Sequence, residues 1–286
     1  MFNDSQKHLI NTSFTVTEHN GNVTVSPVDC LDLHDTLDCG QAFRWRELEP
    51  DFWQGVAHGR ILKIKKTPVA LTLINTTQVE FEKIWRPYFD LDRDYPAIRR
   101  RLSVDPVLAA ASEYAGGIRI LRQEPFETLC SFIISQNNHI PRIKGIIGRL
   151  CGLLGEDLGG EFSFPSPEKM AGLTPFDLAP IRAGFRDAYL CDAAQKVASG
   201  EVDFSALEKL PLDEARLSLQ KIRGVGPKVA DCVLLFGLGR VEAFPVDVWI
   251  KRVLSDLYDG SLPAIAAPYA GIAQQYLFHY IRTAKI

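Results

Sequence analysis

The chain has 286 residues, of which 46% are hydrophobic and 23% are charged, and its formal net charge is −3. This is the composition of an ordinary folded protein, and it excludes a disordered or fibrous chain. The longest apolar run, CVLLFGLG, is too short to span a membrane, and the opening MFNDSQKHLI lacks the basic and apolar regions of a signal peptide. We therefore expect an intracellular protein without a membrane partner.

The first quarter of the chain has the pattern of a β-sheet. Between about residues 12 and 77, apolar and polar residues alternate in short segments separated by Gly, Asn and Pro, namely VTVSP, QAFRWREL, RILKIKK and ALTLINT. Such alternation is typical of antiparallel strands with one buried face. From about residue 78 the apolar period becomes helical. The predicted fold class is α+β: a small antiparallel β domain with a helical end over residues 1–105, and a larger helical body in two lobes over 106–286.

Several predicted helices begin with a capping residue followed by proline. The side chain of the capping residue satisfies a free backbone N–H group. Proline at the first helical position costs no helical hydrogen bond. The pattern occurs at Asp105-Pro106, Ser166-Pro167 and Thr174-Pro175, and with a poorer cap at Glu124-Pro125. We expect helices over residues 105–115, 125–136, 141–154, 167–173, 175–183, 186–199, 212–222, 227–238, 247–258 and 264–282.

The six cysteines are scattered along the chain without a CxxC pair. Their spacing predicts neither a zinc site nor a disulfide framework, so we expect mostly buried thiols and neither a metal nor a cofactor.

The segment LQKIRGVGPKVADCVLLFGL predicts a helix, a glycine turn and a second helix over about residues 212–239. The turn consists of Gly224, Val225 and Gly226. Glycine lets backbone N–H groups approach a phosphate, and the start of a helix attracts anions, so the turn suits the backbone of DNA. An ordinary turn between two helices would show the same glycines. The turn alone therefore does not establish DNA binding.

Two charged residues after this turn are candidates for catalysis. Lys228 lies in the first turn of its predicted helix, where the helix dipole disfavours the ammonium and favours the neutral amine that a nucleophile needs. Asp247 precedes the next predicted helix as an N-cap, and its carboxylate suits a positive charge developing on a sugar. A solvated lysine and a simple cap are the alternatives.

The motif GVGPKVADC followed by PVDVW resembles the helix-hairpin-helix DNA glycosylases, and in particular the 8-oxoguanine DNA glycosylase family. Further blocks resemble that family in the same order along nearly the whole chain: CGQAFRWRE, GIRILRQEPFE, SFIISQNNHIPRIKG, AGFRDAYL and PYAGIAQQYLF. The resemblance implies a bifunctional DNA glycosylase and AP lyase for base excision repair. Such an enzyme flips 8-oxoguanine, opposite cytosine, out of double-stranded DNA, attacks C1′ with a lysine and nicks the strand through a Schiff base by β-elimination.

The resemblance also implies roles for individual residues. Lys228 matches the nucleophile and Asp247 the catalytic carboxylate. Gly40 matches the residue whose carbonyl accepts the N7–H that guanine lacks. The other matching residues are Gln274 for the Watson–Crick edge, Phe278 and Cys232 for the two faces of the base, Asn137, Arg142 and Arg186 for the opposite cytosine, Phe185 for the wedge, and Gly224, Val225, Gly226 and Trp249 for the DNA backbone.

Two of these positions depart from the best-known eukaryotic members, in which the wedge is a tyrosine and the position of Trp249 holds a histidine. With no basic tail after Ile286, we expect a prokaryotic-like member. We also expect a monomer, because one flipped base requires one pocket. It would act in the cytoplasm at the nucleoid of a prokaryote or in the nucleus of a eukaryote.

Two other readings of the sequence remain open. One is a monofunctional glycosylase for another damaged base, although alkylated-base enzymes lack the lysine. Iron–sulfur glycosylases need cysteines after the hairpin, and none follows Cys232. The other is a DNA-binding module without enzymatic activity, which would need no Asp247.

Overall fold

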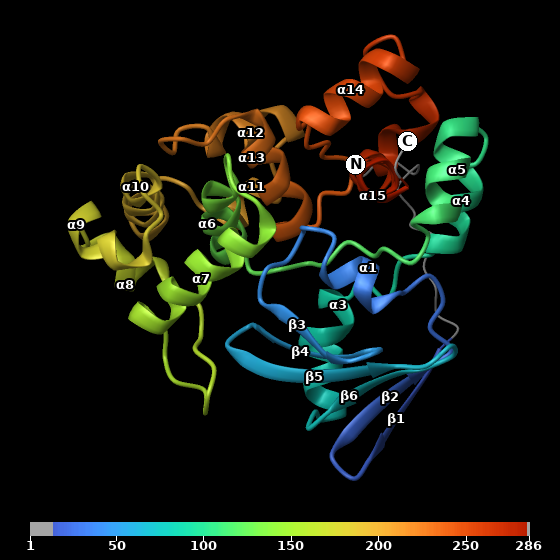
Figure 1. Ribbon diagram of the computed structural model, residues 1–286, viewed down its shortest axis with the longest axis horizontal. Helices are drawn as coiled ribbons and strands as arrows, with labels where there is room; N and C mark the ends of the chain where they lie inside the picture. Colours follow the sequence, from blue (N-terminus) through green and yellow to red (C-terminus); the bar gives the residue numbers. More distant parts are fainter. Residues whose placement is uncertain (1–13, 285–286) are drawn as a thin grey trace.

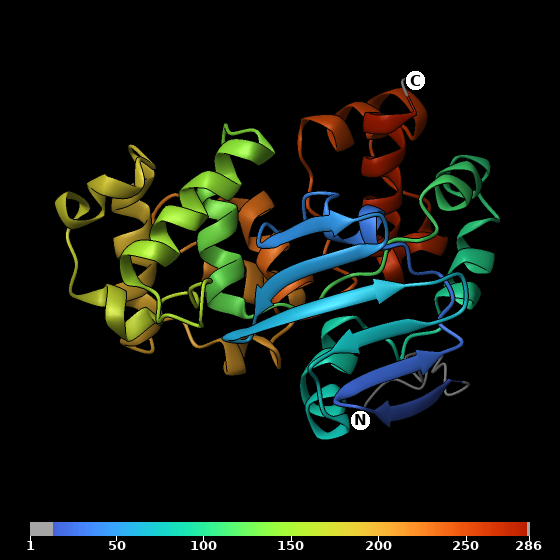
Figure 2. The same ribbon diagram turned by 60° about the horizontal axis from the view of Figure 1, so that its bottom comes forward.

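The computed structural model describes residues 14–284. The predictions based on the opening segment MFNDSQKHLI and on the chain end at Ile286 therefore lie outside the described residues. Its first part is a six-stranded sheet in the order β1-β2-β6-β5-β4-β3, with every neighbouring pair antiparallel. The strands are β1 (Thr15–His19), β2 (Asn22–Ser26), β3 (Trp45–Glu49), β4 (Phe52–Ala57), β5 (Arg60–Lys66) and β6 (Leu71–Ile74). Figure 2 shows β1 at the outer edge and β3 at the edge nearest the last helices. The predicted antiparallel sheet is confirmed.

One face of the sheet is covered by helices, as its alternating pattern requires. In β5, Leu62 and Ile64 are buried and Lys63 and Lys65 are exposed. The covering segment is α2 (Gln78–Glu80), a π-helical turn (Phe81–Trp85) and α3 (Arg86–Tyr88), and its Phe81 shares a core with the apolar face of the sheet.

The rest of the chain is helical (Figure 1). Its helices are α4 (Tyr95–Leu102), α5 (Pro106–Tyr114), α6 (Pro125–Ser135), α7 (Ile140–Leu154), α8 (Pro167–Ala171), α9 (Pro175–Leu178), α10 (Arg186–Ala198), α11 (Phe204–Leu207), α12 (Leu212–Leu219), α13 (Pro227–Cys232), α14 (Val248–Leu257) and α15 (Ala270–Thr283). Most of them pack around a second apolar core. The predicted boundary between folding units at residue 105 stays a prediction.

Some predicted helices differ from those observed. The predicted helix 264–282 is a 3₁₀ segment, Ala264–Tyr269, followed by α15, because Pro268 has no N–H for an α-helical bond. The predicted helix 227–238 is α13 continued by a π-helical turn, Val233–Gly237. Asp105 and Ser166 cap their helices as predicted, and Glu124 makes no capping bond.

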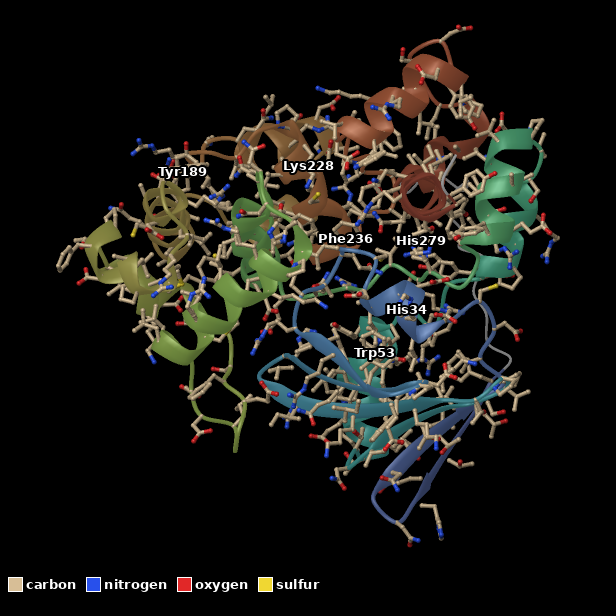
Figure 3. All side chains as sticks on the ribbon, in the orientation of Figure 1. His34, Trp53, Tyr189, Lys228, Phe236 and His279 are labelled. Carbon is tan, nitrogen blue, oxygen red and sulfur yellow. The ribbon has the colours of Figure 1, made fainter. Side chains whose placement is uncertain are left out.

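The short helix α1 (Leu33–Leu37) joins the two parts of the molecule (Figure 3). On one side the ring of His34 packs edge-on against Trp53 of β4, with 6.2 Å between ring centres. On the other side Oδ1 of Asp35 lies 3.4 Å from Nε2 of His279 on α15. The loop after α1, which carries Gly40, is thereby held beside the last helix.

Candidate active site

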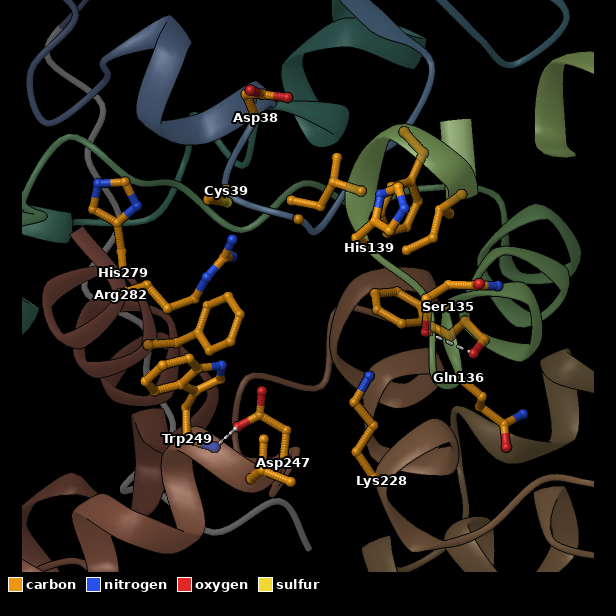
Figure 4. Close-up of a pocket in the computed structure, with 18 of the residues that line it drawn as sticks. Asp38, Cys39, Ser135, Gln136, His139, Lys228, Asp247, Trp249, His279 and Arg282 are labelled. Carbon is orange, nitrogen blue, oxygen red and sulfur yellow. Dashed lines mark hydrogen bonds between the residues drawn. The ribbon is translucent and has the colours of Figure 1, made fainter. Parts of the chain in front are cut away.

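A cleft of about 1120 Å³ lies between α1, the end of α6, and the starts of α7, α13 and α14, with the end of α15 as a further wall. Figure 4 shows Lys228 and Asp247 pointing into this cleft from different elements. Six of the residues selected from the sequence line it: Gly40, Asn137, Lys228, Asp247, Trp249 and Phe278.

Lys228 is the second residue of α13, which Gly226 and Pro227 start as expected for a helix N-terminus. Its side chain is half-buried, and Nζ lies 4.9 Å from the centre of the Phe132 ring on α6. The predicted position in the first turn of the helix is confirmed. An aromatic face attracts an ammonium group, so the ring holds the amine at the wall of the cleft.

Asp247 caps α14, as predicted. Its Oδ1 accepts hydrogen bonds from the backbone N–H groups of Trp249 at 3.0 Å and Ile250 at 2.9 Å. The second carboxylate oxygen takes no part in these bonds and remains available to the cleft. Trp249 itself is 37% exposed at the rim.

Cys232 lies one helical turn after Lys228 and is buried beneath the cleft. Burial raises the pKa of its thiol to about 11, and the nearby Lys228 ammonium lowers that pKa only in part. The side chain is therefore a neutral thiol at physiological pH. Cys232 and the buried Gln274 lie behind the residues that line the cleft, rather than among them.

The loop after α1 is linked to α15 by a chain of hydrogen bonds. The Cys39 thiol lies 3.6 Å from two acceptors, the carbonyl oxygen of Thr36 and Oε1 of Gln275, and Nε2 of Gln275 donates to Oε1 of Gln274 at 2.7 Å. Burial raises the pKa of Cys39 to about 12, which keeps this thiol a donor. The next residue, Gly40, has a φ of +99°, a conformation that favours glycine. These contacts set the position of the Gly40 loop relative to Gln274.

The hairpin turn packs tightly against α10. Gly224 has a φ of +80°, and a Cβ built on it would lie 2.2 Å from Cδ2 of Tyr189. Val225 is buried, whereas Gly226 is exposed with open space around it. The backbone N–H of Arg223 donates to Asp192 at 2.7 Å. The turn is therefore rigid on its inner side and accessible at Gly226.

The four residues predicted for the wedge and the opposite base lie in different environments. Asn137 and Arg142 are exposed around the start of α7, and Phe185 is 59% exposed at the start of α10. Arg186 is buried: it donates to the carbonyl oxygens of Ala183, at 3.0 Å, and Gln136. Its guanidinium lies 4.3 Å from the ring centre of Phe185. In this structure Arg186 contacts the Phe185 ring and the backbone just before Asn137, and it is not exposed as the other three are.

The sequence analysis missed three residues of the site. Phe132 faces Lys228, Gln275 holds Gln274, and Arg282 lies 4.8 Å from the ring centre of Phe278. The adjacent Gln-Gln pair and the four-residue spacing from Phe278 to Arg282 were the available signals. Phe132 gave none, because an aromatic residue in an apolar helix also fits a core.

Within residues 14–284, no group of three or more His, Cys, Asp or Glu side chains is placed to hold a metal ion. No helix in that same range is long and apolar enough to cross a membrane.

A lysine beside a glycine hairpin, with a capping aspartate at the same cleft, is the arrangement expected of a DNA glycosylase of the helix-hairpin-helix superfamily. In agreement, residues 130–261 match the family described as HhH-GPD superfamily base excision DNA repair protein, and residues 23–129 match the 8-oxoguanine DNA glycosylase N-terminal domain. The chain belongs to the 8-oxoguanine DNA glycosylase family and is an enzyme of the N-glycosylase/DNA lyase type.

Similar proteins cover almost the whole chain. The structure of MBOgg1 in complex with a low affinity DNA ligand is 41% identical, with a TM-score of 0.90 over 96% of this chain and 99% of that one. The Clostridium acetobutylicum 8-oxoguanine glycosylase/lyase, in complex with double-stranded DNA containing cytosine opposite 8-oxoguanine, is 38% identical, with a TM-score of 0.89 over 95% and 99%. A Methanothermobacter thermautotrophicus protein named "Probable N-glycosylase/DNA lyase" is 29% identical over 90% of this chain and 95% of its own.

Proposed function

We propose that this enzyme excises 8-oxoguanine from double-stranded DNA and then cuts the strand at the abasic site, with Lys228 as nucleophile and Asp247 as the catalytic carboxylate. The observation that carries the proposal is the placement of these two side chains at one cleft whose walls also include Gly40 and Phe278. The similarity to the Clostridium acetobutylicum 8-oxoguanine glycosylase/lyase supports the same activity.

The first chemical step is displacement of the base. The lone pair of the neutral Lys228 amine forms a bond to C1′, and the C1′–N9 bond breaks with its electron pair passing to the base. The amine nitrogen becomes positively charged and gives a proton to the departing base. Asp247, with one oxygen held by two backbone N–H groups, stabilises the positive charge on the sugar.

Strand cleavage then follows from the covalent intermediate. The nitrogen lone pair forms the C1′=N bond of a Schiff base as the C1′–O4′ bond breaks, and O4′ takes a proton. Loss of a proton from C2′ shifts electrons toward C3′, and the 3′ phosphate leaves. Hydrolysis by water frees Lys228. Glycosylase and lyase activity therefore use the same amine.

Recognition of the lesion uses groups fixed by the fold. The Gly40 carbonyl accepts N7–H of 8-oxoguanine, whereas it faces a repelling lone pair on guanine. Gln274, held by Gln275, reads the Watson–Crick edge, and Phe278 and Cys232 cover the two faces of the base. A base must leave the duplex to reach this buried set of groups.

Residues around α7 and α10 occupy the space that the flipped base vacates. Phe185 enters the duplex as the wedge, while Asn137 and Arg142 donate to the O2 and N3 acceptors of the opposite cytosine, supported by Arg186. Gly224, Val225, Gly226 and Trp249 contact the backbone. We expect preference for lesions opposite cytosine, and Arg142→Ala to reduce that preference when excision opposite each of the four bases is compared.

A single chain supplies all of these groups, so the enzyme is proposed to act as a monomer. Its place of action is the DNA, in the nucleoid of a prokaryote or the nucleus of a eukaryote.

The proposal is tested by incubating the enzyme with a duplex that contains one 8-oxoguanine opposite cytosine, and with the same duplex containing guanine. The products are compared with and without alkali. We expect a nick in the lesion strand without alkali. Cleavage that appears only after alkali would indicate a monofunctional enzyme, and equal cleavage of the guanine duplex would exclude the proposed substrate.

A further inference from the structure

Arg282 is a cation at the cleft to which the proposed function assigns no role. It lies on α15, one helical turn after Phe278, and it lines the same cleft as Lys228 and Asp247. Its guanidinium carbon is 4.8 Å from the centre of the Phe278 ring. Figure 4 shows the side chain extended from α15 toward Cys39. An arginine stacked on an aromatic face keeps its N–H donors free at the edge of the plane.

The donors of Arg282 lie beside Gly40. A Cβ built on Gly40 would be 4.0 Å from Nη1 of Arg282. The nearest acidic residues of the Gly40 loop and α1 are already engaged: Asp38 lies 2.6 Å from Nζ of Lys144, and Asp35 contacts His279. Within residues 14–284, Arg282 makes neither a hydrogen bond nor an ion pair, so its charge is available to a ligand that enters between Gly40 and Phe278.

The chemistry of the lesion fits this position. 8-Oxoguanine differs from guanine at two adjacent atoms: N7 carries a hydrogen, and C8 carries an oxygen. If the Gly40 carbonyl accepts N7–H, the neighbouring O8 lies within the reach of a donor placed beside Gly40. O8 also shares the electron pair that N9 receives when the C1′–N9 bond breaks, because N9 and O8 are both bonded to C8.

We propose that Arg282 is a further substrate-binding residue, which donates to O8 of the flipped base and stabilises the negative charge on that base as it leaves. This inference rests on the proposed function and extends it: the enzyme reads both new atoms of the lesion, N7–H through Gly40 and O8 through Arg282. Because the charge on O8 increases as the bond breaks, the contact strengthens in the transition state and accelerates excision.

A guanidinium also binds phosphate, so a DNA phosphate is the competing ligand. The position of Arg282 favours the base. It lies beside Gly40 and Phe278, which are groups proposed to contact the base, whereas the proposed backbone contacts lie on the hairpin and at the start of α14. The two ligands are separable by experiment, because an abasic site keeps the phosphates and lacks the base.

The test compares the unmodified enzyme with Arg282→Gln under single-turnover conditions. Excision of 8-oxoguanine opposite cytosine should slow at least tenfold. Strand cleavage at a preformed abasic site, and affinity for a duplex carrying a tetrahydrofuran abasic analogue, should stay within twofold. Arg282→Lys keeps the charge and loses the planar fork, so it should be intermediate.

Arg101→Gln is the matched control. Arg101 is also an exposed arginine stacked on an aromatic ring, 5.9 Å from the centre of Tyr269, and it lies outside the cleft. The substitution Arg101→Gln removes the same charge as Arg282→Gln and should leave excision unchanged. Equal losses of excision, abasic cleavage and affinity in Arg282→Gln would overturn the inference in favour of a phosphate contact, and unchanged excision would overturn it outright. Failure of the unmodified enzyme to excise 8-oxoguanine would instead refute the proposed function.

Discussion

Nζ of Lys228 lies against the Phe132 ring, 4.9 Å from its centre, and within residues 14–284 it forms no ion pair with Asp247. The carboxylate is held by the backbone of α14 instead. A direct ion pair would stabilise the ammonium form and close the space between the two groups. With separate partners, the two side chains leave room for a sugar to enter between them.

Asp247→Asn separates the two roles of this residue. Asparagine caps helices about as well as aspartate, so the free energy of unfolding should change by less than about 0.5 kcal/mol. Loss of the charge should slow base excision on the order of 10²-fold or more. Chemical denaturation and single-turnover excision measure the two effects. Asp247→Ala, which removes the cap as well, should cost about 1 kcal/mol more. A fall in stability with normal excision in Asp247→Asn would reduce the residue to a cap.

Cys232 should remain a thiol in the native enzyme. Its raised pKa of about 11 predicts that thiolate absorbance in the ultraviolet appears only at strongly alkaline pH, with Cys232→Ser used to assign the signal. The Cys39 thiol, with a pKa of about 12, should likewise become a thiolate only at strongly alkaline pH. Since folding raises both pKa values above 9.0, the free energy of unfolding should fall as the pH rises from 9.0 toward these values. Thiolate from Cys232 at neutral pH would contradict this and indicate a thiolate–ammonium pair with Lys228.

Gln275→Met should weaken lesion selectivity. The change keeps a similar volume and removes both hydrogen bonds, leaving the Oε1 of the buried Gln274 without its donor, at a cost of about 1–3 kcal/mol. The ratio of kcat/KM for 8-oxoguanine over guanine should fall, and cleavage of a preformed abasic site should be unaffected. In a double-mutant cycle, Cys39→Ala and Gln275→Met should be non-additive. Unchanged selectivity in Gln275→Met would show that Gln274 needs no such support.

Gly224→Ala should distort the hairpin. Its Cβ would meet Tyr189 in a backbone conformation that suits glycine, with an expected loss of about 1–3 kcal/mol in the free energy of unfolding. Tyr189 also contacts the Phe185 ring, with 5.6 Å between ring centres, so affinity for duplex DNA should fall as well. Gly148→Ala, inside α7 with open space around the glycine, is the control and should preserve stability. Equal stability of the two variants would contradict the packing described for Tyr189.

The sequence predicted those features that depend on local pattern. The alternation in RILKIKK predicted a strand with one buried face, on which the structure places Leu62 and Ile64. The cap and proline patterns placed Asp105, Ser166 and Asp247 at helix starts. Features that depend on contacts between distant segments were not predictable. The burial of Arg186 under Gln136, and the bonds from Cys39 to Gln275, join residues far apart in the chain. The short helix α1 gave too few residues for a helical period.

The catalytic role of Lys228 is tested most directly by borohydride trapping on a duplex with one 8-oxoguanine opposite cytosine, using the guanine duplex and Lys228→Gln as controls. Borohydride reduces a Schiff base to a stable covalent bond between enzyme and DNA. We predict an adduct only for the unmodified enzyme on the lesion duplex. An adduct formed equally by Lys228→Gln would assign the nucleophile to another amine, and no adduct with the unmodified enzyme, despite DNA binding, would contradict the Schiff-base mechanism.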